Sequence, residues 1–173
     1  MVSILAASMD YRVYDALLAN YVSAAGVDYE TWASSPKDVT RLNDFVADMA
    51  RMDVSEMSAD EQCAFYINLY NAAMLQQVLQ HYPIGSVTEI GAEPFSVFKK
   101  ENIRQGDRWL SLDQIEKGIL LPEYSDPRIH FAINCASESC PPLRSEAFTA
   151  EDLEAQLEAQ TRSFAQSAHA AVV

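Results

Sequence analysis

The chain is most constrained by one long helical segment with a defined start and a defined end. Ser58-Ala59-Asp60-Glu61 has the pattern of a capping box, in which side chains satisfy free backbone N–H groups at the start of a helix. Apolar residues follow at helical spacing as far as Tyr82, and Pro83 cannot continue a helix. The sequence therefore predicts its most regular helix over residues 58–82.

Polar residues interrupt the stripe of this helix that is expected to be buried. One line down the helix consists of Ala64, Asn68, Asn71, Leu75, Val78 and Tyr82. A carboxamide left unpaired in a protein core costs ~1 to 3 kcal/mol. We therefore expect Asn68 and Asn71 to have partners, either the backbone of a neighbouring loop or the side chains of a site.

Further long helices are predicted from periodicity and caps. Tyrosines and leucines at helical spacing predict an amphipathic helix over residues 11–21, which ends before Gly26. A serine followed by proline starts a helix over residues 35–49. A threonine cap starts a last helix over residues 149–164.

The middle of the chain has weaker patterns. Residues 85–106 show no clean period and are interpreted as loop-rich, whereas residues 108–110 are predicted to form a short strand. A serine and a glutamine then form a second capping box for a short helix over residues 112–117. Gly118 is expected to end that helix.

The segment that follows contains alternating apolar residues. Asp126-Pro127 is expected to turn the chain into a strand over residues 129–134, with isoleucines and phenylalanine on one face and His130 on the other. Pro141-Pro142 cannot continue a central strand.

The composition is that of one globular domain and argues against several partners. The 173 residues are 49% hydrophobic and 21% charged, which suits a single domain spanning residues 1–173. The net charge of −13 repels phosphate backbones, so no nucleic-acid partner is expected. No run approaches the ~20 apolar residues of a spanning helix, so no membrane insertion is expected.

The sequence leaves the cellular compartment open. The start MVSILAAS lacks the basic residues and the length of a full signal peptide. The expectation is a soluble protein of unknown compartment, exported or periplasmic where a leader precedes this stretch of chain.

The residue types most often used in catalysis and metal binding are grouped in one short segment. The chain has 3 cysteines and 3 histidines, and residues 130–140 hold His130, Cys135 and Cys140. Three interpretations compete: a thiol nucleophile with its base, a zinc site, or cysteines that merely pack as free thiols or as a small disulfide. A zinc site in this segment would lack a Cys-x-x-Cys pair and an obvious fourth ligand.

The nucleophile interpretation depends on the path of the backbone. A straight strand rises ~3.3 Å per residue, which would leave His130 and Cys135 roughly 16 Å apart. Hydrogen-bond contact therefore requires a sharp bend near Asn134, or a ring that pairs with Cys140 instead.

Three separated motifs resemble one family. AFYINLYNAAMLQQVLQHYP, WLSLDQIEKGIL and DPRIHFAINCASESCPPLRSEAF, in this order, closely resemble the family catalogued as domain of unknown function 547. The likeness extends from about Val27 to Phe164. The family is found in bacteria, often with an export signal, and within longer proteins of plants and animals.

The resemblance implies a fold and a set of site residues. The family looks like a distant relative of papain-like and transglutaminase-like thiol enzymes, which implies an α+β fold with several helices packed on a small antiparallel sheet. Its histidine and cysteine correspond to His130 and Cys135, and its acidic partner corresponds to Glu116. Its helix asparagines correspond to Asn68 and Asn71.

This chain departs from the family pattern at two points. Lys117 stands where the family usually has histidine, which argues against a mechanism that uses a second imidazole. Family members also commonly continue past the last helix, whereas this chain stops at AQSAHAAVV, so part of the family domain is expected to lie beyond it.

Two functional hypotheses follow. In the first, the protein is a thiol-dependent hydrolase or acyltransferase for a peptide or amide, with Cys135 as nucleophile, His130 as base and Glu116 as orienting carboxylate. In the second, the same residues form the polar core of a non-catalytic module that binds a peptide or small molecule. No metal ion and no cofactor is expected. The supporting residues are Asn68, Asn71, Asn134, Cys140 and Arg144.

Overall fold

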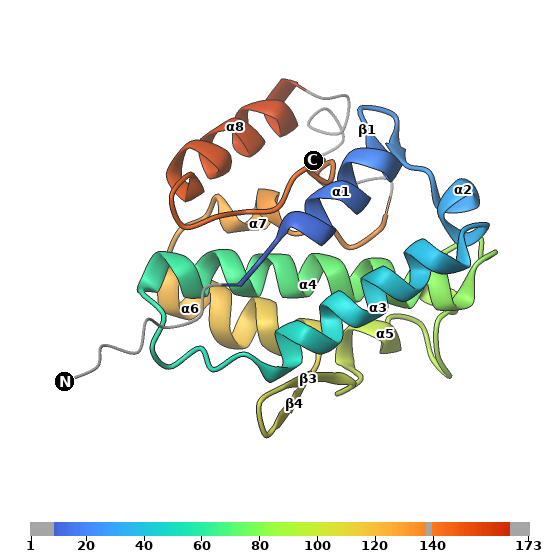
Figure 1. Cartoon of the computed structure of the whole chain (residues 1–173), viewed down its shortest axis with the longest axis horizontal. Helices are drawn as coiled ribbons and strands as arrows, with labels where there is room; N and C mark the ends of the chain where they lie inside the picture. The colour runs from blue at the N-terminus through green and yellow to red at the C-terminus, as the bar shows by residue number, and fades with distance from the viewer. Residues whose placement is uncertain (1–8, 138–139, 167–173) are drawn as a thin grey trace.

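Helices make up most of the fold, and the longest of them runs through its middle. The computed structural model describes residues 9–137 and 140–166; the predictions for MVSILAAS and for the chain after Gln166 lie outside this range. Figure 1 shows α4 (Ala59–His81) between α1 (Arg12–Tyr21) and α8 (Leu153–Gln166) on one side and α6 (Leu121–Tyr124) on the other.

The other elements are short, apart from one helix that packs across α4. That helix is α3 (Pro36–Arg51), which contacts α1 and α4. The remaining elements are β1 (Val22–Ser23), β2 (Gly26–Val27), α2 (Tyr29–Ala33), η1 (Val87–Glu89), α5 (Ser96–Lys99), β3 (Ile103–Gln105), β4 (Arg108–Leu110), η2 (Gln114–Leu120) and α7 (Ile129–Ala132).

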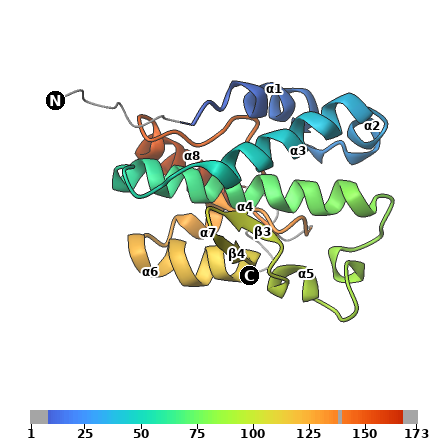
Figure 2. The same cartoon turned by 60° about the horizontal axis from the view of Figure 1, so that its bottom comes forward.

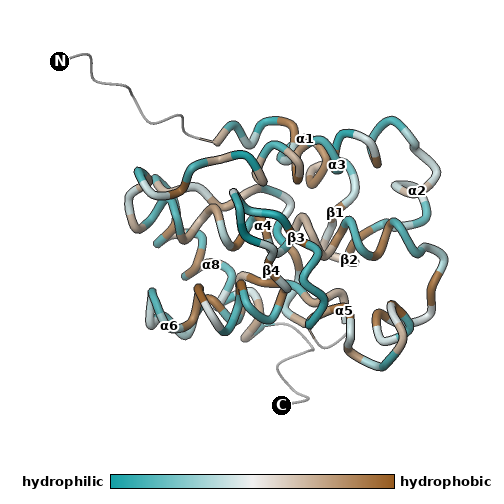
Figure 3. The backbone as a smooth tube through the Cα atoms, turned by 90° about the horizontal axis from the view of Figure 1, so that it is seen from below, coloured by the Kyte–Doolittle hydropathy of each residue, from teal (hydrophilic) through white to brown (hydrophobic). Residues whose placement is uncertain are grey.

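The strands form two small antiparallel sheets, and the fold is α+β. In the first sheet Val22 pairs with Val27, and in the second Ile103 pairs with Leu110. Figure 2 shows the β3–β4 hairpin with α5 and α7 on one side of α4, and α1, α2 and α3 on the other. Figure 3, which views the molecule from below, shows that the hairpin consists mostly of hydrophilic residues.

Helix α4 forms as predicted and is the centre of the core. Ser58 N–H donates to Glu61 Oε2 at 2.8 Å and Glu61 N–H donates to Ser58 Oγ at 3.3 Å, so the capping box is confirmed. Almost every residue from Cys63 to Leu79 is buried. None of the described helices is both long enough and apolar enough to cross a membrane.

The other predicted helices are confirmed with small changes. Helix α1 covers residues 12–21, and α3 has proline in its first turn, although the Ser35 hydroxyl makes no capping hydrogen bond. Asp152 N–H donates to Thr149 Oγ1 at 3.3 Å ahead of α8. The strand predicted over residues 108–110 is β4.

The strand predicted over residues 129–134 is wrong. Residues 129–132 form the helical turn α7, and the extended backbone begins after it, at Ile133, with φ −101° and ψ 139°. Asp126 and Pro127 explain the difference: the Asp126 carboxylate accepts from Arg128 N–H at 2.9 Å, and proline fits the start of a helical turn. The alternation of apolar residues was too short to separate a strand from a buried helical turn.

The prediction that Gly118 ends a helix is also wrong. The π-helical turn η2 runs through it, and the helical path ends at Ser125, which has a positive φ of 51°. Ile119 and Leu120 are 5% and 0% exposed. Burying them offsets the ~1 kcal/mol that glycine costs in a helix, because each is worth ~1.5–3 kcal/mol.

Asn68 has the backbone partner that its buried position requires. Its Nδ2 donates to Phe148 O at 2.7 Å, and its Oδ1 accepts from Phe148 N–H at 2.9 Å. The Asn68 side chain of α4 thereby fixes Phe148, which lies 80 residues further along the chain in the segment that leads into α8.

Replacing Asn68 with alanine should lower the free energy of unfolding by about 2–4 kcal/mol, because two buried backbone groups of Phe148 lose their partner. Urea denaturation of both proteins measures this difference. Asn20→Ala, at an exposed position of α1, is the matched control and should change the value by less than about 0.5 kcal/mol. Equal effects of the two substitutions would contradict the role of Asn68.

Candidate functional site

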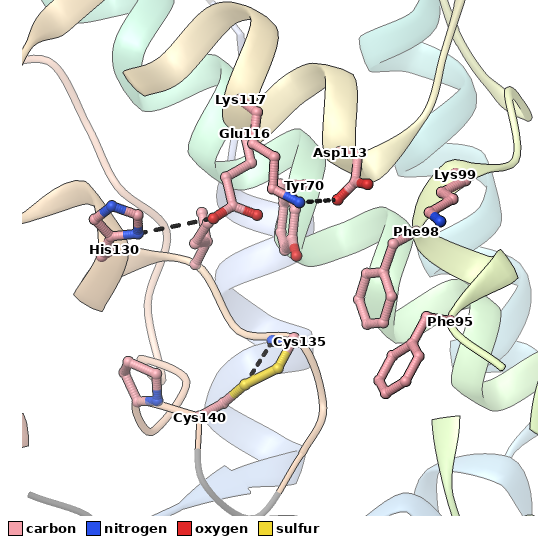
Figure 4. A pocket seen from close by; sticks show the side chains of 12 residues that line it. Tyr70, Phe95, Phe98, Lys99, Asp113, Glu116, Lys117, His130, Cys135 and Cys140 are labelled. Carbon is pink, nitrogen blue, oxygen red and sulfur yellow. Dashed lines mark hydrogen bonds and ion pairs between the residues drawn. A yellow bond between two sulfur atoms is a disulfide. The ribbon is translucent and has the colours of Figure 1, made fainter. Parts of the chain in front are cut away.

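The predicted cysteines, histidine and glutamate line one pocket. The cavity has a volume of about 470 Å³ and lies between α4, α5, η2 and the loop after α7. Figure 4 shows two phenylalanine rings on one side and the sulfur atoms, His130 and Glu116 on the other. The lining includes Tyr70, Phe98, Glu116, His130, Cys135 and Cys140.

Asn71 of α4 holds the backbone that carries the cysteines. Its Nδ2 donates to Ala132 O at 2.9 Å and its Oδ1 accepts from Asn134 N–H at 2.9 Å. The partners predicted for Asn71 are therefore backbone groups of a loop. Since Asn71 is 3% exposed, these hydrogen bonds are shielded from water and fix the end of α7 against the core.

Asn134 continues this arrangement into the cysteine loop. Its Nδ2 donates to Pro141 O at 2.7 Å, and its Oδ1 accepts from Ala136 N–H at 2.8 Å. Ala136 has a positive φ of 57°, so the chain reverses there. Asn134 thus joins the two ends of the loop that begins at Cys135 and ends at Cys140.

Cys135 and Cys140 are joined by a disulfide across this loop. Cys135 N–H also donates to Cys140 Sγ at 3.3 Å. The short covalent loop and the Asn134 carboxamide restrain the same backbone. Cys63 is a free thiol buried in α4, and its burial raises its pKa to about 12.

Glu116 and His130 lie side by side at the pocket wall. His130 Nδ1 is 3.7 Å from Glu116 Oε1, and the side chains are 53% and 19% exposed respectively. Burial raises the pKa of Glu116, with smaller opposing effects from Lys117 and His130. In the described part of the chain, His130 makes no hydrogen bond to either sulfur, and Figure 4 shows its ring directed at Glu116.

Two of the predicted supporting residues lie elsewhere. Asn68 bonds to Phe148, outside this pocket. Arg144 pairs with Glu146 and stacks on the Phe148 ring at 5.6 Å from its centroid, also outside the pocket. The structure therefore brings together Glu116, His130 and the cysteines but not these two side chains.

Sequence reasoning missed part of the pocket. Tyr70 forms part of its lining from α4, and burial keeps its phenol neutral by raising its pKa. Phe95, Phe98 and Lys99 come from the region interpreted as loop-rich. For Tyr70 the signal was its position between the two asparagines; for the α5 residues no periodic signal was present.

One comparison with known proteins gives a match. The family described as "Protein of unknown function, DUF547" matches residues 54–165. The chain belongs to this family. The matched range contains all three motifs that carry the resemblance, and with them the whole pocket. Searches of the curated proteins and of the solved structures give no match to this DUF547 chain.

Reducing the disulfide should lower the free energy of unfolding by about 2 kcal/mol, because the loop spans a sequence separation of 5 and the reduced unfolded chain gains entropy. Urea denaturation with and without dithiothreitol measures this change. The Cys135→Ser/Cys140→Ser variant is the control and should show no effect of the reductant. Equal stability of the wild type in both conditions would contradict the prediction.

Replacing Glu116 with glutamine should stabilise the protein relative to wild type increasingly as the pH rises from about 4 to 7. Because burial raises the pKa of the Glu116 carboxyl in the folded protein above its ordinary value of 4.5, this group holds its proton more tightly in the folded state than in the unfolded chain. The contribution of Glu116 to the free energy of unfolding therefore falls as the pH rises through the window, and glutamine, which does not ionise, removes that fall.

Thermal and urea denaturation at several pH values measure the difference between Glu116→Gln and wild type. Glu123→Gln, at an exposed position of α6, is the matched control and should show little pH-dependent difference. A difference for Glu116→Gln that stays constant with pH would contradict the assignment.

Proposed function

We propose that this pocket, once its disulfide is reduced, is a thiol-dependent hydrolase or acyltransferase site for a peptide or amide. One observation carries the proposal: Cys135, His130 and Glu116 line a single cavity, with Glu116 against the imidazole. A nucleophile, a base and a carboxylate beside that base are the parts that thiol catalysis needs.

The site first needs a reductant. A dithiol transfers two electrons and two protons to the disulfide, which gives two cysteine thiols and the oxidised dithiol. Cys135 Sγ is then free to rotate, and Cys135 N–H loses its bond to Cys140 Sγ. His130 is 53% exposed, which leaves room for the ring to bring Nε2 toward the thiol while Nδ1 stays beside Glu116.

The acyl-transfer step then uses the thiolate. His130 takes the proton of the Cys135 thiol, the sulfur forms a bond to the substrate carbonyl carbon, and the C–N bond breaks as the leaving amine takes that proton. Water or an acceptor amine then attacks the thioester, and its proton returns through His130 to the Cys135 sulfur. Glu116 orients the ring and stabilises its charged form.

Two groups are available to donate hydrogen bonds to the oxyanion: the Cys135 N–H and the Tyr70 hydroxyl. The Asn71 carboxamide and Ala136 N–H are already paired, so the released Cys135 N–H is the better backbone donor. The Tyr70 hydroxyl is the second donor, because it is neutral and is directed into the pocket in Figure 4. Donors of this kind act most strongly where water is excluded.

A non-catalytic module is the second candidate. It is favoured by the joined sulfur atoms and by the contact of His130 with Glu116. In that case the pocket binds a peptide or small molecule with its disulfide intact, and Cys135 needs no special reactivity.

After reduction, iodoacetamide at pH 7 should label Cys135 at least about 10-fold faster than Cys63, because His130 favours the Cys135 thiolate whereas burial protonates Cys63. The rate should fall as the pH is lowered, because protonation of the Cys135 thiolate removes the nucleophile. Mass spectrometry of digested samples gives both rates. Cys140→Ser should show the same labelling without reductant.

Turnover is tested with p-nitrophenyl acetate as the acyl probe. Cys140→Ser should release an initial burst of nitrophenol, and His130→Ala in that background should slow the burst by about 10²-fold or more. His81→Ala is the control, since His81 lies at the end of α4 and outside the pocket. Equal, slow labelling of Cys135 and Cys63 with no burst would favour the binding module.

A further inference from the structure

The side of the pocket opposite the cysteines is formed by two aromatic side chains, of which Phe95 is exposed and Phe98 is partly buried. Figure 4 shows the Phe95 and Phe98 rings next to each other at the pocket. Phe95 is 57% exposed, an unusual state for a large apolar side chain. An exposed aromatic at the rim of a concave site is typical of a surface that a ligand covers.

The backbone at Phe95 is held in a conformation that phenylalanine rarely adopts. Its φ of 64° and ψ of 7° lie in the left-handed region, which costs ~1 kcal/mol or more for such a residue. Ser96 keeps it there: Ser96 Oγ donates to Ile90 O at 3.1 Å, and Ser96 N–H donates to Glu93 O at 3.1 Å.

Gly91 allows this close approach. Its φ is +105°, and a Cβ atom at Gly91 would overlap Ser96 Oγ. Phe95 is therefore held at the pocket in a strained backbone conformation, by a close contact between Gly91 and Ser96. Backbone strain of this kind is found mainly at functional sites, which favours a binding role for Phe95.

A cation lies in the same short helix. Lys99 lines the pocket, is exposed, and has no ion-pair or hydrogen-bond partner for its ammonium group among the described residues. Lys117, the other lysine of the pocket, is occupied by Asp113 at 2.7 Å. In a chain with a net charge of −13, a free ammonium beside two aromatic rings favours an anionic group on the ligand.

We propose that the pocket recognises a peptide whose C-terminal residue is aromatic, with the aromatic side chain against Phe95 and Phe98 and the terminal carboxylate on Lys99. This inference names the substrate class of the proposed function and rests on the same pocket. It does not require thiol chemistry, because the recognition elements lie on α5 and the disulfide is on the opposite side.

Binding is measured by NMR titration of the oxidised protein with Gly-Gly-Phe, Gly-Gly-Phe-amide and Gly-Gly-Gly. Gly-Gly-Phe should bind at least about 10-fold more tightly than Gly-Gly-Gly, because an aromatic side chain becomes buried. It should bind about 2- to 5-fold more tightly than its amide, because a partly exposed ion pair is lost in the amide.

Variants assign the two contacts. Phe95→Ala should weaken binding of Gly-Gly-Phe at least about 5-fold, whereas Trp109→Ala, which removes another aromatic side chain that is 57% exposed, should not. Lys99→Gln should remove the preference for the carboxylate over the amide, whereas Lys100→Gln should keep it. Circular dichroism and thermal unfolding check that each variant is folded.

The outcomes separate this inference from the proposed function. Equal binding of the three peptides, or equal effects of Phe95→Ala and Trp109→Ala, overturns the inference whether or not Cys135 is reactive. The expected peptide preference together with an unreactive Cys135 supports the inference and overturns only the catalytic proposal.

Discussion

The hydrogen bonds of the Asn71 carboxamide decide the shape of the pocket. A carboxamide offers a donor and an acceptor side by side, so Asn71 holds both Ala132 O and Asn134 N–H from inside the core. Asn134 repeats the arrangement one step further out, toward Ala136 and Pro141. Because Asn71 is buried, loss of either bond would leave unpaired polar groups, and the loop has little freedom to shift.

The two sides of the pocket are held in place by different interactions. Cys135 and Cys140 are restrained by a disulfide and by the Asn134 carboxamide, whereas the imidazole of His130 is 53% exposed and has Glu116 as its neighbour. The opposite wall is held by Ser96 and Gly91, at the cost of strain at Phe95. A backbone held by buried hydrogen bonds is what a binding or catalytic pocket requires.

Much of the scaffold could be predicted from the sequence, and part of the site could not. The capping box and the terminating proline located α4, and the buried stripe indicated that Asn68 and Asn71 need partners. The segment at residues 129–134 was interpreted with the wrong period, because Asp126-Pro127 starts a helical turn as readily as it starts a strand. No pattern pointed to Phe95 or Lys99, since the short α5 segment has no period.

The sequence by itself determined what depends on near neighbours: the helix starts and stops, the position of the two asparagines on a buried face, and the grouping of His130, Cys135 and Cys140. The tertiary structure alone decided which backbone those asparagines hold, 61 and 80 residues away, and which aromatic wall faces the sulfur atoms. The physical reason is the distance along the chain over which each kind of interaction acts. Caps and periodicity act within a few residues, whereas a buried hydrogen bond or a pocket joins segments that only the packed core brings together.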